Sequence, residues 1–82
     1  MTVQYRVIAY NRTTDRVGSI IDVPKPLVPQ VLAIARFGKA LSCEPGESDL
    51  DGSQAREVAN VLNFRSDPSR FHYHLETIVT AP

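Results

Sequence analysis

The chain has 82 residues, of which 43% are hydrophobic and 22% are charged, and its formal net charge is zero. This length predicts one domain over residues 1–82 with a single modest core, and the composition excludes a disordered chain. A neutral chain lacks the basic excess of a dedicated nucleic-acid binder, and no apolar run resembles a signal peptide or a membrane span. We therefore expect a cytoplasmic protein.

The N-terminal part of the chain predicts a β-hairpin. Residues 3–10 are rich in β-branched and aromatic side chains, and strand alternation places Val7 on one face and Arg6 on the other. Turn-forming residues occupy 11–15, and an extended pattern resumes over 16–23. Two such runs joined by a short polar connection are typical of an antiparallel hairpin.

Two helices are expected in the middle of the chain. Prolines at 24–29 suit the first turn of a helix over 27–37, which has few polar residues and should be largely buried. The second helix begins at Asp51, a good N-cap, because Gln54 stands at capping-box spacing. Asn63 is a reasonable terminator.

The last segment, 71–79, alternates between two faces and predicts a third strand. The order is then strand, strand, helix, helix, strand. The simplest fold is an α+β domain with a three-stranded, mainly antiparallel sheet and two helices packed on one face. The opposite face should be polar. It would carry Gln4, Arg6, Tyr10, His72, His74 and Glu76.

Charge is distributed unevenly along this neutral chain. The first forty residues hold six basic and two acidic residues, and the remainder hold three basic and seven acidic residues. The acidic residues gather between the two predicted helices, in segment 43–51, which we expect to be an exposed loop. Such a surface can steer a basic partner. The predicted partner-binding residues are Glu44, Glu47, Asp49, Asp51 and Glu57.

A metal site is the alternative reading of the last strand. Alternate residues of a strand point the same way, so His72, His74 and Glu76 are suitably spaced to hold one ion, such as zinc with an open fourth position. That arrangement would make the chain a small metal-binding protein or enzyme. A solvated face, with Arg6 paired across strands to Glu76, is the simpler interpretation.

No catalytic signature accompanies these residues, and neither an enzyme nor a cofactor is expected. Cys43 is the single cysteine, so no disulfide forms within the chain, and no nucleophile motif surrounds it. A further alternative is a small RNA-binding regulator, although no RNA-recognition motif is present. Its basic, aromatic patch would comprise Arg6, Arg12, Arg16 and Lys25 with Tyr5 or Tyr10.

Five segments form a pattern over most of the chain: Tyr5–Tyr10, the turn at 11–14, residues 20–24, residues 51–55 and Phe71–Glu76. Together they resemble small bacterial immunity proteins of contact-dependent growth inhibition systems. The resemblance implies a cognate inhibitor that binds and neutralises a bacterial toxin domain with a basic surface, a nuclease for example. An acidic surface suits that role, because it can occlude a cleft made for nucleic acid.

Overall fold

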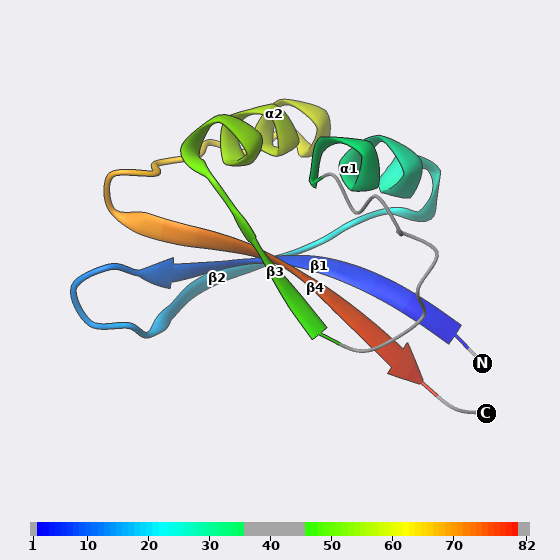
Figure 1. Cartoon of the computed structure of the whole chain (residues 1–82), viewed down its shortest axis with the longest axis horizontal. Helices are drawn as coiled ribbons and strands as arrows, with labels where there is room; N and C mark the ends of the chain where they lie inside the picture. Colours follow the sequence, from blue (N-terminus) through cyan, green and yellow to red (C-terminus); the bar gives the residue numbers. More distant parts are fainter. Residues whose placement is uncertain (1, 36–45, 81–82) are drawn as a thin grey trace.

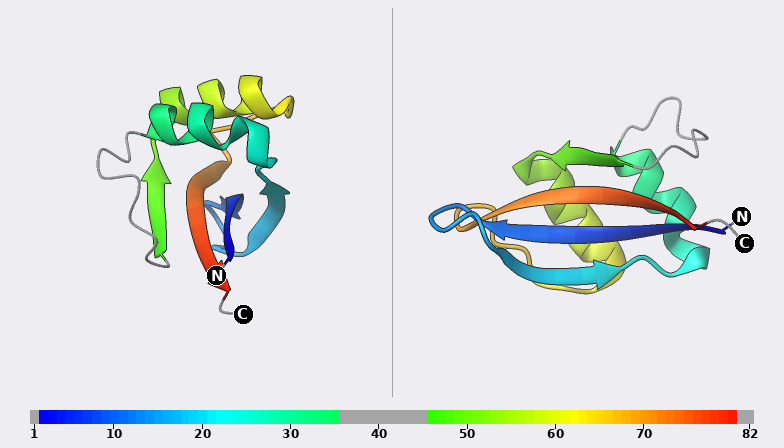
Figure 2. Two further views of the ribbon diagram at one scale, coloured as in Figure 1. Left: turned by 90° about the vertical axis from the view of Figure 1, so that its right-hand side faces the viewer. Right: turned by 90° about the horizontal axis from the view of Figure 1, so that it is seen from below.

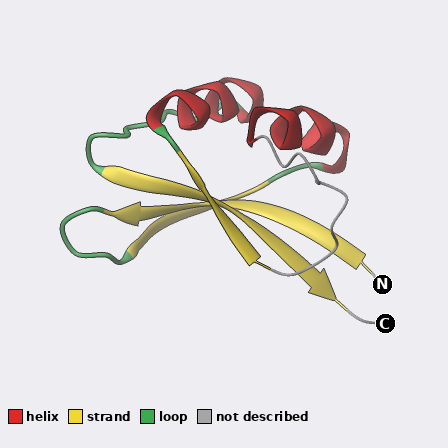
Figure 3. Ribbon diagram, viewed as in Figure 1, coloured by secondary structure: helices red, strands yellow, loops and turns green. Residues whose placement is uncertain are grey.

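The computed structural model describes residues 2–35 and 46–80 and shows an α+β fold (Figures 1 and 3). The elements follow in the order β1 (Thr2–Asn11), β2 (Val17–Asp22), a 3-10 turn η1 (Lys25–Leu27), α1 (Val28–Ala35), β3 (Gly46–Leu50), α2 (Gly52–Leu62) and β4 (Phe71–Thr80). The predicted hairpin and last strand are confirmed. The first helix is confirmed over Val28–Ala35, while residues 36 and 37 lie outside the described part.

The four strands form one antiparallel sheet in the order β2-β1-β4-β3. The central pair, β1 and β4, is in register from Thr2–Thr80 to Asn11–Phe71, so the start of β1 and the end of β4 lie side by side (Figure 1). Both helices cover one face of the sheet, and the other face is free of helices in the described residues (Figure 2). The two-layer arrangement and antiparallel pairing agree with the sequence-based expectation.

The expected three-stranded sheet is wrong, and the loop expected at 43–51 is wrong over Gly46–Leu50, because these residues form a fourth strand. Residues 43–45 lie outside the described part. This strand lies between the two helices in sequence and pairs with β4 at the sheet edge. Acidic residues and glycine are depleted in strands, and Leu50 is the only buried residue of the five. An edge strand with polar outward positions therefore has almost no alternation signal to detect.

The core lies between the helices and the inner face of the sheet. Val7 and Leu75 from the central strands meet Val31 of α1 and Val58 of α2, and all four side chains are fully buried. Burial of each such side chain contributes roughly 1.5–3 kcal/mol, which makes these contacts the main source of stability. The burial pattern of β4 confirms the alternation predicted over residues 71–79. In β1 the alternation is incomplete, because Val7, Ile8 and Ala9 are all buried.

Local hydrogen bonds fix the connections. In the hairpin turn, Asn11 Oδ1 accepts from the backbone N–H groups of Thr13 (2.8 Å) and Thr14 (3.0 Å). The capping box predicted at Asp51 and Gln54 is present. Asn63 ends α2 in the left-handed conformation (φ 59°), which asparagine tolerates better than most residues.

Candidate protein-binding surface

The sheet surface opposite the helices, called the open face below, carries most of the candidate residues. Because successive strand residues point to opposite faces, Val7 and Leu75 enter the core while Arg6 and Glu76 project outward. The strand register places Arg6 opposite Glu76 and Tyr10 opposite His72. At the β3 edge, Glu47 and Asp49 point outward, since the neighbouring Leu50 is buried in the core.

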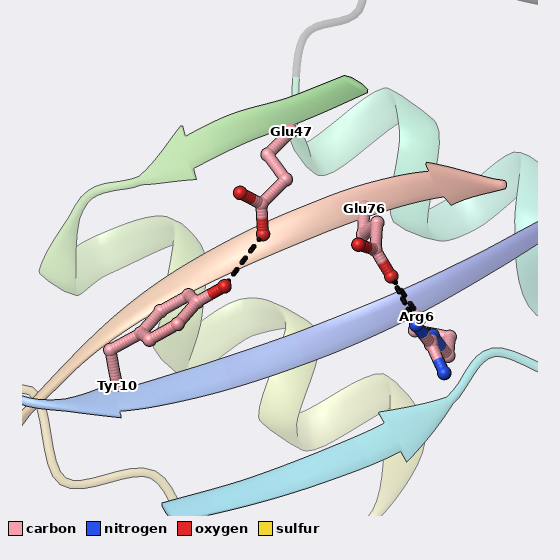
Figure 4. A network of polar contacts seen from close by, with 4 residues as sticks. All are labelled: Arg6, Tyr10, Glu47 and Glu76. Atoms are coloured by element: carbon pink, nitrogen blue, oxygen red, sulfur yellow. Dashed lines mark hydrogen bonds and ion pairs between the residues drawn. The ribbon is translucent and has the colours of Figure 1, made fainter. Parts of the chain in front are cut away.

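Arg6 and Glu76 form the ion pair expected from the sequence (Figure 4). Arg6 donates from Nη2 (2.6 Å) and from Nε (3.0 Å) to the same oxygen, Oε1 of Glu76. The side chains keep 34% and 24% of their accessible surface, so solvent screens the attraction and the pair contributes no more than about 1 kcal/mol. The pair also changes the charge of the open face, because Arg6 neutralises the carboxylate of Glu76.

Glu47 is directed instead toward Tyr10. The Tyr10 hydroxyl donates a 3.0 Å hydrogen bond to Glu47 Oε1, bridging from β1 to β3 across β4 (Figure 4). This bond and the negative charge of Glu47 raise the pKa of Tyr10 above its ordinary value of 10.0. Glu47 is also the direct cross-strand neighbour of Glu76. Like charges at such positions repel, and separate partners for the two carboxylates reduce that repulsion.

Asp49 is a highly accessible outward carboxylate with a partner. Its side chain is 89% exposed, and Oδ1 lies 3.0 Å from His74 Nδ1. The His74 ring packs edge-on against Tyr10, with ring centroids 5.0 Å apart and an interplanar angle of 84°. Tyr10 therefore connects Glu47 and, through His74, Asp49. The open face holds two carboxylates in defined positions beside one aromatic side chain.

The structure does not gather all five predicted residues at one place. Asp51 is exposed at the junction of β3 and α2, where its carboxylate accepts the 2.7 Å N-cap bond from Gln54 N–H. Glu57 is exposed on α2, in the helical layer on the other side of the sheet from the open face (Figure 2). Glu44 lies outside the described residues. Of the predicted residues that the structure describes, Glu47 and Asp49 share the open face, and Asp51 lines a surface hollow together with Asp49 and His74.

Sequence reasoning did not foresee the partners of these carboxylates. Tyr10 and His74 orient the two carboxylates. Alternation alone predicted that Tyr10 and His74 share a face, but it did not predict that this face lies beside β3. Two other aromatic side chains, Tyr73 and Phe64, are not available on this face. Tyr73 is 5% exposed, its hydroxyl accepts a 2.8 Å bond from Asp67 N–H, and Phe64 packs beside it.

The three candidate metal ligands are each engaged with a different neighbour. His72 Nε2 accepts from Arg12 Nη1 at 3.1 Å, His74 pairs with Asp49, and Glu76 pairs with Arg6. Across residues 2–35 and 46–80, no group of three His, Cys, Asp or Glu side chains is placed to hold a metal ion. Cys43, the only thiol, lies outside the described residues.

The arginines of the proposed RNA patch are also engaged in part. Arg6 is held by Glu76, and Arg12 donates from Nε to the carbonyl oxygen of Pro68 at 2.7 Å as well as to His72. These contacts use donor groups that phosphate recognition requires. Arg6 and Arg12 therefore keep fewer free donor groups for a phosphate backbone.

Comparison with protein families, curated proteins and solved structures gave no match for this chain. Among the described helices, none has the length and apolar character needed to cross a membrane.

Proposed function

We propose that this protein is an immunity protein that binds and neutralises a bacterial toxin domain with a basic surface, a nuclease for example. The observation that carries the proposal is the pair of outward carboxylates, Glu47 and Asp49, on an edge strand of the open face. The resemblance of the sequence to toxin-immunity proteins supports the same role. In this proposal the chain acts by occupying its partner's surface and performs no catalysis.

The physical support comes from how the carboxylates are held. The hydrogen bond from Tyr10 restricts Glu47, and the 3.0 Å contact with His74 restricts Asp49, before a partner arrives, so less side-chain entropy is lost on binding. Both carboxylates stay at the surface, where complementary charge accelerates association with a cationic protein. Tyr10 lies beside them and supplies an aromatic contact of the kind that interfaces favour.

The test begins by capturing the partner from the native strain with the wild-type chain and a Glu47→Lys/Asp49→Lys variant as baits. We expect a basic protein to be retained by the wild type at low salt and lost with the variant. The captured protein is then purified and its association rate measured against ionic strength. Growth rescue by co-expression of the wild-type chain tests neutralisation itself.

Glu57→Lys is the matched control for a single Glu47→Lys change. It makes the same charge reversal at an exposed position in the helical layer. We expect Glu47→Lys to slow association and Glu57→Lys to leave it nearly unchanged, because exposed charges more than a Debye length from an interface are screened. Equal effects of the two variants, or a captured protein whose binding ignores salt, would refute the open face as the interface.

A further inference from the structure

The two edges of the sheet differ in a way that the proposed function does not explain. The edge strand β3, Gly46–Leu50, carries two carboxylates in five residues. The opposite edge strand, β2, has the sequence Val-Gly-Ser-Ile-Ile-Asp, with no lysine, arginine or proline and one acid at its end. Charged side chains and prolines are the usual protection of an edge strand against pairing with another chain. By this measure β2 is the unprotected edge.

Exposed aliphatic surface is concentrated on the same strand. In the described residues, the exposed large hydrophobic side chains are Val17 (51%) and Ile20 (50%), and both belong to β2. Their cross-strand partners are Tyr10 and Ile8, so the two side chains continue the open face toward the edge. Ile8 beneath them is 4% exposed. Two half-exposed aliphatic residues at an edge strand form a surface that another strand can cover.

The backbone of β2 has unused hydrogen-bonding capacity on its outer side. Within residues 2–35 and 46–80, β2 pairs with β1 alone, and no β2 residue takes part in a backbone hydrogen bond outside that ladder. The register with β1 is regular from Ser19 to Asp22 and shifts beside Gly18. The regular portion is the part able to accept a further strand.

We propose that a second copy of this chain pairs with β2 in the antiparallel direction, with Ile20 facing Ile20 of the second copy on the two-fold axis. This register places Ser19 opposite Ile21 of the second copy, within the regular portion, and brings Asp22 opposite Gly18, where the register with β1 shifts. The two residues of each cross-strand pair project from the same side of the sheet. No acidic residue lies opposite another acidic residue. The contact is self-complementary, as a two-fold interface requires. The two sheets become one continuous eight-stranded sheet.

Charge does not oppose a second copy at this edge, whereas it opposes one at the other. The chain is neutral overall, so two copies approach without net repulsion. Antiparallel self-pairing at β3 would bring Glu47 and Asp49 of the two copies together, which is unfavourable. The β2 pairing leaves both β3 edges at the far ends of the assembly. The dimer would therefore present two acidic edges, and its formation does not depend on the proposed toxin-binding role.

The experiment measures the mass of the purified chain in solution at high micromolar concentration by light scattering. We expect the wild type near twice the protomer mass of 9.1 kDa. Ile20→Lys and Ile20→Glu should each give 9.1 kDa alone, because like charges then meet on the axis. An equimolar mixture of these two variants should restore the dimer. Position 20 is half exposed, so both variants should fold; circular dichroism checks this, and Ile20→Thr provides a milder change that weakens the dimer.

Glu47→Lys/Asp49→Lys, at the opposite edge, should leave the dimer mass unchanged. A wild-type chain that stays at the protomer mass would overturn the proposal. So would Ile20→Lys remaining dimeric, a mixture of the two charged variants remaining monomeric, or loss of the dimer in the Glu47→Lys/Asp49→Lys variant. None of these results bears on capture of a basic partner, so the two proposals fail separately.

Discussion

Asp51 has a structural role within the acidic segment, because it caps helix α2, and this role can be tested apart from partner binding. Its Oδ1 accepts from Gln54 N–H at 2.7 Å, and Gln54 Oε1 accepts from Asp51 N–H at 2.9 Å. Gln54 Nε2 also donates to the carbonyl oxygen of Ile34 at 3.2 Å, which ties the start of α2 to α1. Asp51→Ala removes the cap and leaves a helix N–H without its partner, which should cost about 1 kcal/mol of unfolding free energy. Asp51→Asn keeps a capping oxygen and loses only the charge near the helix N-terminus, which should cost at most about 0.5 kcal/mol.

Urea unfolding followed by circular dichroism measures this difference. With a slope of roughly 1–1.5 kcal/mol per molar urea, typical of a small domain, Asp51→Ala should lower the midpoint by about 0.7–1 M. Its melting temperature should fall by about 4–8 °C. Glu57→Ala, which removes an exposed carboxylate from the same helix, is the control and should change little. Equal losses for Asp51→Ala and Asp51→Asn would refute the reasoning, because charge rather than capping would then explain them.

Three further outcomes test the sheet. A double-mutant cycle with Arg6→Met and Glu76→Gln should give a coupling of about 0.5–1 kcal/mol that shrinks in high salt; zero coupling contradicts the pair. The raised pKa of Tyr10 means that its bond to Glu47 stabilises the fold below pH 10 and is lost above it. In Glu47→Gln, tyrosine titration by NMR should show the Tyr10 pKa returning toward 10.0. Leu75→Ala should cost about 2–5 kcal/mol of unfolding free energy by denaturant, and a loss below 1 kcal/mol would place Leu75 outside the core.

The candidate surface was only partly readable from the amino-acid order. Alternation over 71–79 placed His74 and Glu76 on the polar face and Tyr73 in the core, and the structure agrees. The contact between Glu47 and Tyr10 joins residues 37 positions apart through an intervening strand. No local pattern encodes that contact, because it depends on which strand occupies the edge.

The sequence by itself determined the elements whose causes are local. Side-chain alternation specified the hairpin and the last strand, and the capping pair at Asp51 and Gln54 specified where α2 begins, since each signal acts within a few residues. Only the tertiary structure decided that Gly46–Leu50 is a strand. Its backbone groups form a ladder because β4 is there to pair with them, and a short acidic segment has no such preference alone. That pairing turned an expected loop into an edge strand and set Glu47 and Asp49 beside Tyr10 and His74.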